Sequence, residues 1–132
     1  MILAVGTRQA FAAGEFIYHR DDPAAFFYIL MAGDVRLRLG DEGPELFAIS
    51  RPGEVFGWSS LIGREHHTVS AACRRSTTAL KMNKNRLIAI FDNDPESGFV
   101  FYKQLARALG SRLLQIYETV SGCSRSGASH FS

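Results

Sequence analysis

The sequence predicts a mainly β domain that is followed by one long helix. Between residues 8 and 83, short apolar runs alternate with clusters of glycine, proline and aspartate, which is the pattern of an antiparallel sandwich, barrel or jelly roll. After Asp94 the apolar residues recur at steps of three and four, which is the period of a helix. The 132 residues are 46% hydrophobic and 21% charged, a composition that suits one globular domain with its own core.

The β part contains eight predicted strands. Turn residues separate them, for example at Arg20–Pro23, Gly33–Asp34 and residues 40–44. In the fourth strand Val35, Leu37 and Leu39 alternate with arginines, so one face should be buried and the arginines solvated. The predicted strands are residues 8–11, 16–18, 25–32, 35–39, 45–50, 55–56, 68–74 and 77–82.

Two helices are expected next, over residues 83–91 and about 95–120. Asp94 is suited to cap the second helix, Pro95 to occupy its first position, and Glu96 to face its positive end. One row of apolar residues in this helix follows a heptad seam, which predicts a dimer interface with a twin helix. The alternative is that this row and a second apolar stripe both pack against the same chain. The seam consists of Phe99, Tyr102, Ala106, Leu109, Leu113, Ile116 and Val120.

Residues 52–71 carry the strongest functional signal. Gly53 and Gly57 flank a short apolar strand, and an amphipathic run, a polar turn and another strand follow. The first N–H groups of a helical turn have no partner within it and favour an anion, and Gly57 permits a close approach to the backbone. The alternative is an ordinary loop that crosses between two strands.

This segment resembles the phosphate-binding cassette of cyclic-nucleotide-binding domains, the sensor module of the catabolite activator (Crp/Fnr) family and of kinase regulatory subunits. Two positions depart from the family pattern. The glutamate that binds the ribose hydroxyls falls on Trp58, and the arginine that binds the phosphate falls near Glu65, with Arg64 one residue away. The matching residues are Phe56, Gly57, Ser60, Leu61, Ile62, Val69 and Ala71.

The resemblance extends from about residue 11 to residue 120. It implies a double-stranded β-helix (jelly roll) barrel with flanking short helices and a long C-terminal helix that forms a parallel dimer. Gly14, Gly33 and Gly53 fit structural turn positions of these domains, and Asp21-Asp22 replaces the usual Gly-Asp. The expected domain is therefore residues 1–120, with residues 121–132 as a serine- and glycine-rich flexible tail.

The resemblance implies a regulatory domain that binds a cyclic nucleotide or another small anionic effector and signals through the dimer helix. It would be the sensor part of a transcriptional regulator or a stand-alone form; no cofactor is certain. One alternative is a ligand-free dimeric scaffold that binds another protein, and another is a regulator truncated before its DNA-binding domain. The expected ligand-binding residues are Gly57, Trp58, Ser59, Ser60, Leu61, Arg64 and Thr68.

Other classes of function fit the sequence poorly. A net charge of +2 gives no broad basic face, and residues 121–132 are too few for a helix-turn-helix domain, so direct nucleic-acid binding is not expected. No run is long enough to span a membrane, and sparse cysteines favour a cytoplasmic setting. His66 and His67 are adjacent and lack a nearby set of metal ligands, and no Gly-x-Ser-x-Gly motif occurs, so neither a metal site nor an enzyme is expected. The two histidines are instead expected to flank the mouth of the pocket and to be pH-sensitive.

Overall fold

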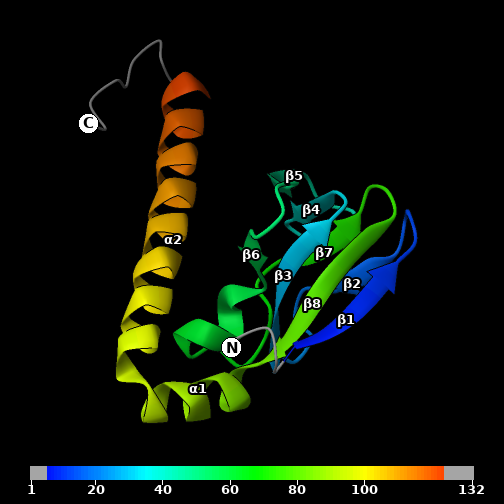
Figure 1. Ribbon diagram of the computed structural model, residues 1–132. Coiled ribbons are helices and arrows are strands. Elements are labelled where there is room, and N and C mark those ends of the chain that lie inside the picture. Colours follow the sequence, from blue (N-terminus) through cyan, green and yellow to red (C-terminus); the bar gives the residue numbers. More distant parts are fainter. Residues whose placement is uncertain (1–5, 124–132) are drawn as a thin grey trace. The chain divides into compact units, whose positions relative to one another are not determined.

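The structure is a computed structural model that describes residues 6–123. The chain divides into two compact units at the peptide between Ile90 and Phe91. The first unit holds the strands and most of a short helix, and the second holds the long helix (Figure 1).

Within the described residues, eight strands form two antiparallel four-stranded sheets with the orders β1-β8-β3-β6 and β2-β7-β4-β5. Strands that are neighbours in a sheet are mostly distant in sequence, and the two sheets face each other across the core (Figure 1). This arrangement confirms the predicted jelly roll. The strands are β1 (Gly6–Phe11), β2 (Phe16–Tyr18), β3 (Phe26–Ala32), β4 (Val35–Arg38), β5 (Glu45–Ile49), β6 (Val55–Phe56), β7 (Ser70–Cys73) and β8 (Thr77–Asn83).

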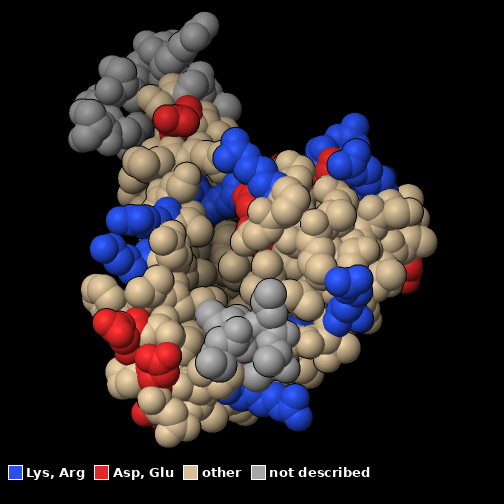
Figure 2. Space-filling model, in the orientation of Figure 1, with Lys and Arg blue, Asp and Glu red and all other residues tan. Residues whose placement is uncertain are grey.

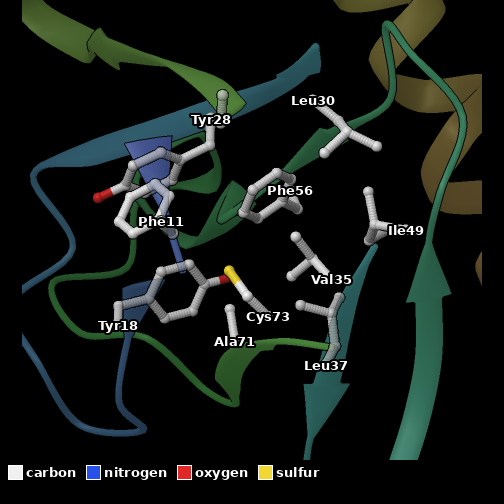
Figure 3. Packing of buried hydrophobic residues seen from close by; sticks show 11 residues of the cluster. Phe11, Tyr18, Tyr28, Leu30, Val35, Leu37, Ile49, Phe56, Ala71 and Cys73 are labelled. Carbon is white, nitrogen blue, oxygen red and sulfur yellow. The ribbon is translucent and has the colours of Figure 1, made fainter. Parts of the chain in front are cut away.

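The core of the roll collects inward-facing side chains from both sheets (Figure 3). In β4 the side chains of Val35 and Leu37 are buried, whereas Arg36 lies on the opposite face and pairs with Asp34 at 2.8 Å and Glu45 at 3.0 Å. The predicted alternation is confirmed for Val35–Arg38, but Leu39, predicted for the buried face, follows the strand and keeps 45% of its surface exposed. The Arg36 guanidinium holds the pKa of Asp34 below its usual range.

Several turns of the roll need backbone with positive φ, among them those at Gly33 and Asp21. Gly33 has φ 125°, and a Cβ at this position would lie 2.6 Å from the Cα of Thr77, so only glycine fits. Its expected role as a structural turn residue is confirmed. Asp21 has φ 75° in the turn between β2 and β3, where the Gly-Asp of the family is replaced, and left-handed backbone is strained for a residue with a side chain.

The helical part begins at α1 (Lys84–Asn93) and continues in α2 (Pro95–Cys123). Asp94 caps α2 as predicted, because its carboxylate accepts hydrogen bonds from the Ser97 N–H at 3.3 Å and the Ser97 hydroxyl at 2.6 Å. The helix continues three residues beyond the predicted end, since loss of the apolar period at residue 121 removes a packing surface but no backbone hydrogen bond. The remainder of the predicted tail, residues 124–132, lies outside the described residues.

The helix α2 carries many large apolar side chains that stay accessible. Phe91, at the end of α1, packs against its first turns, with ring centroids 5.4 Å from Phe101 and 5.9 Å from Tyr102. Five residues of the predicted seam nevertheless keep between 38% and 68% of their surface exposed; they are Phe99, Tyr102, Leu113, Ile116 and Val120. Ala106 is also exposed and Leu109 is partly buried.

Candidate functional site

The segment predicted to bind a ligand forms one turn of 3-10 helix, η2 (Trp58–Ile62), directly after β6. Gly57 precedes it in a left-handed conformation with φ 76°. Gly63 closes it with φ 84°, and the N–H groups of Gly63 and Arg64 donate to the carbonyl oxygen of Ser59, the latter at 2.9 Å. Two glycines with positive φ therefore set where this turn begins and ends.

An aromatic floor lies beneath the start of η2. The Tyr18, Tyr28 and Phe56 rings stack in series, with centroids 5.9 Å and 5.4 Å apart, and Figure 3 shows the same three rings in the core. The N–H of Gly57 donates a hydrogen bond to the Tyr18 hydroxyl oxygen, which opposes the rise that burial causes in the pKa of Tyr18. A Cβ on Gly57 would lie 3.3 Å from Tyr28 and 3.4 Å from Tyr18, so the backbone rests directly on this floor.

Two polar atoms of η2 are buried without a hydrogen-bond partner among the described residues. They are Nε1 of the Trp58 indole and Oγ of Ser60, a residue with only 1% of its surface exposed. A buried donor that stays unpaired costs about 1–3 kcal/mol. Such groups are rare in native folds and call for a specific explanation.

The loop after η2 is fixed by backbone pairing with the loop that follows β2. The Asp21 N–H donates to the His67 carbonyl, and the His67 N–H donates to the Asp22 carbonyl, both at 2.9 Å. A third bond joins the Ala24 N–H to the Glu65 carbonyl at 2.8 Å. These bonds turn the side chain of His67 inward, where it stacks on the Tyr18 ring with centroids 3.7 Å apart.

The burial of His67 differs from the expectation that both histidines flank the pocket mouth. His66 is exposed, but His67 is buried, because it continues inward the alternation of Val69, Ala71 and Cys73. Residues 63–67 are mostly polar, so the burial of His67 was not expected from its neighbours. Extending the inward alternation of the predicted strand 68–74 backwards by one position, from Val69 to His67, would have found it.

The structure places the seven predicted ligand residues at different depths. Gly57, Ser59 and Ser60 are buried, and Trp58 and Leu61 are partly buried. Arg64 and Thr68 are exposed on the loop. The buried and partly buried residues lie together in and before η2, whereas the two exposed ones follow it.

A polar chain beyond the loop joins the start of β7 to the loops that follow β2 and β4. The Ser70 hydroxyl donates to Asp41 at 2.7 Å, and the other carboxylate oxygen of Asp41 lies 2.8 Å from His19 Nδ1. Both contacts lower the pKa of Asp41. A serine nucleophile needs a base within reach of its hydroxyl, but here the serine contacts the acid and not the imidazole, so this set ties loops together and is not arranged for acyl transfer.

Comparison with known proteins assigns the family. Residues 8–94, more than half of the chain, match the family model described as the cyclic nucleotide-binding domain. The chain belongs to this family. The matched range covers β1 in large part, the rest of the roll and α1, and so includes η2 and its loop.

Relatives of the family include longer regulators. The chain is similar to the nitrogen fixation regulation protein FixK of Azorhizobium caulinodans, with 29% identity over 98 residues, which are 73% of this chain and 38% of FixK. The catabolite activator protein of Thermus thermophilus is 25% identical with a TM-score of 0.72, over 90% of this chain and 57% of that one. The c-di-GMP-responsive regulator CLP of Xanthomonas campestris is 22% identical with a TM-score of 0.78, over 90% and 59%, and shares the fold. The chain thus spans about two fifths of the length of FixK, and less than two thirds of the catabolite activator protein and of CLP.

Neither a membrane-spanning helix nor a metal-binding cluster is found among residues 6–123. No helix between residues 6 and 123 is both long and apolar enough to cross a bilayer, and no three histidine, cysteine or acidic side chains in that range gather where a metal ion would bind. On the face that Figure 2 shows, lysine and arginine side chains lie in several separate groups, interrupted by acidic ones.

Proposed function

We propose that this domain senses a small effector, a cyclic nucleotide or another small anion, that binds over η2 and accepts hydrogen bonds from Trp58 and Ser60. The observation that supports the proposal is the pair of buried, unpartnered polar atoms on this turn. An indole N–H can only donate, and a hydroxyl can donate, so both groups are suited to the oxygen atoms of one acceptor-rich molecule.

The proposed site recognises its effector mainly through neutral donors. No carboxylate stands at Trp58 to accept bonds from ribose hydroxyls, and the nearest loop guanidinium, that of Arg64, is exposed. Gly57, Ser59 and Leu61 would surround the effector from the turn, with Arg64 and Thr68 at its rim. Such a site favours an effector with several acceptor oxygens over one that is recognised by its sugar.

The tryptophan at the site provides the test, because it is the only one in the sequence. We would follow the fluorescence of Trp58 while titrating cyclic AMP, cyclic GMP and c-di-GMP. A saturable change with one of them is expected, and Ser60→Ala should weaken its binding about tenfold through loss of one hydrogen bond. Ser76→Ala, on the exposed turn before β8, is the matched control and should bind as the unmodified chain does.

The proposal includes a homodimer formed through the seam of α2, which transmits the bound state by a shift of the helices. The exposed apolar side chains of the seam support it. Leu113→Asp should raise the dimer dissociation constant at least about 100-fold, because the carboxylate would be buried between apolar helices. Ser111→Asp places the same charge off the seam and should leave the dimer intact in analytical ultracentrifugation. By similarity to FixK, the domain would serve as the sensor part of a transcriptional regulator.

A second candidate is a ligand-free dimeric scaffold that binds another protein. It is favoured by one observation, the hydrogen bond that already pairs the Gly57 N–H with Tyr18. A folded, dimeric chain whose Trp58 fluorescence stays constant with every nucleotide and with inorganic phosphate would support this candidate and overturn the sensor.

A further inference from the structure

His67 is a buried histidine that packs on the aromatic floor beneath η2, and the proposed function gives it no role. Its side chain is 4% exposed and lies flat on the Tyr18 ring, with an interplanar angle of 11°. The hydroxyl of the same tyrosine accepts the Gly57 N–H. One ring therefore contacts both His67 and the residue from which η2 begins.

The surroundings of His67 favour its neutral form. Burial lowers the pKa of the imidazole, and the Asp22 carboxylate acts weakly in the opposite direction. That carboxylate already accepts a hydrogen bond from the His19 N–H at 2.8 Å. Asp21, which precedes it, is exposed and pairs through its backbone.

The other elements around His67 present groups that stay uncharged or point to solvent. Burial raises the pKa values of Tyr18 on β2 and Tyr28 on β3, so both are neutral. Ser70 on β7 is committed to Asp41. The charged neighbours on the loop itself, Arg64 and Glu65, are exposed with His66. His67 is thus a potential cation that the free protein leaves without a strong anionic partner.

We propose that binding of an anionic effector over η2 is coupled to the uptake of one proton from solvent by His67. This inference rests on the proposed function. The proton binds a ring nitrogen, no covalent bond to the effector forms, and the negative charge of the effector is offset by the imidazolium. An anion beside a buried imidazole favours its charged form, and by linkage protonation tightens the binding of the anion equally.

Proton uptake makes the affinity depend on pH in a defined direction. The effector dissociation constant should fall as the pH falls, by up to about tenfold for each pH unit, between the two pKa values of His67 with and without the effector. A phosphodiester keeps its single negative charge over this range, so the dependence would come from the protein.

Isothermal titration calorimetry of the unmodified chain with cyclic AMP, cyclic GMP and c-di-GMP tests the coupling. The titrations are run from about pH 5.5 to about pH 8, each in two buffers that differ in ionisation enthalpy. The difference in heat between the buffers counts the protons taken up, and a value approaching one per site is expected. His67→Gln should abolish both the uptake and the pH dependence, whereas His66→Gln, on the same loop, should keep both.

The outcomes separate this inference from the proposed function. Binding without proton uptake, or uptake that His67→Gln leaves unchanged, would overturn the inference and keep the sensor. Absence of binding by all three nucleotides would overturn both together. Should His67→Gln fail to fold, the heat difference in the unmodified chain still decides, together with the ¹³C-detected NMR titration of its histidines with and without nucleotide.

Discussion

The roll buries its large apolar side chains, whereas the long helix leaves many of its own exposed. In the roll, Phe27, Leu30 and Ile49 are completely buried, whereas in α2 Phe99 and Leu114 keep 68% and 60% of their surface exposed. Buried apolar area is the main source of stability in a fold. The roll therefore holds its own stabilising core, and the helix displays apolar surface that its own unit does not use.

The largest effect should separate a leucine of the roll from one of the helix. Leu30→Ala would leave a cavity in the core and should lower the free energy of unfolding by about 2–5 kcal/mol. Leu114→Ala in a dilute, monomeric sample should change it by less than about 0.5 kcal/mol, because that side chain is already accessible. Urea denaturation followed by Trp58 fluorescence measures both, and equal losses would contradict the contrast.

Two turn glycines of the roll, Gly33 and Gly53, separate the cost of backbone strain from the cost of a steric clash. Gly33→Ala combines left-handed backbone with a clash against the Thr77 backbone, and should cost about 2–4 kcal/mol. Gly53→Ala has a similar φ of 93° but no atom within 4 Å of the new Cβ, so it should cost about 1–2 kcal/mol. The difference between the two midpoints in urea measures the clash alone; identical midpoints would show that the Thr77 backbone yields.

The stability of the roll should also depend on pH, through His67. Folding lowers the pKa of His67 from its ordinary value of 6.5, so the unfolded chain binds more protons below that pH. The contribution of the neutral imidazole to the free energy of unfolding is complete above pH 6.5, and it is lost as the pH falls towards the pKa of His67 in the folded protein. Thermal unfolding between about pH 7 and about pH 5 should show this loss. His67→Gln should flatten the profile, and a profile unaltered by it would assign the effect to another group.

The smallest effect should come from Asp21. Asp21→Gly would relieve the strain of its positive φ and should raise the free energy of unfolding by about 0.5–1 kcal/mol. Asp21→Ala removes the same carboxylate but keeps the strain, so it should give no gain. A gain with alanine as large as that with glycine would point to the charge and not to the backbone.

The order of the elements could be predicted from the sequence, because period and turn chemistry are local. The alternation around Arg36, the cap at Asp94 and the glycine turn at Gly33 all follow from neighbours within a few positions. The two buried, unpartnered polar atoms of η2 could not be predicted in this way. Whether Ser60 Oγ finds a partner depends on side chains that are brought together only by the fold.

The depth of the residues in the loop after η2 could be predicted only in part. The alternation of Val69, Ala71 and Cys73 extends back to His67 and indicates that it turns inward, whereas the backbone pairing of this loop with Asp21 and Asp22 could not be foreseen. Arg64 is exposed on this loop, and its contact with an effector stays a prediction. Ligand recognition depends on such non-local geometry more than the fold does.

If an effector binds as proposed, the hydrogen bond between Tyr18 and Gly57 makes the tyrosine its competitor for the Gly57 amide. An effector that draws on the Gly57 amide must first displace the phenol oxygen, so its apparent affinity is reduced by the fraction of molecules in which that amide is engaged. Tyr18→Phe would remove the competitor while keeping the ring under η2 and beside His67. In the proposed sensor, the strength of this one internal hydrogen bond would therefore help to set the effector concentration at which the domain responds.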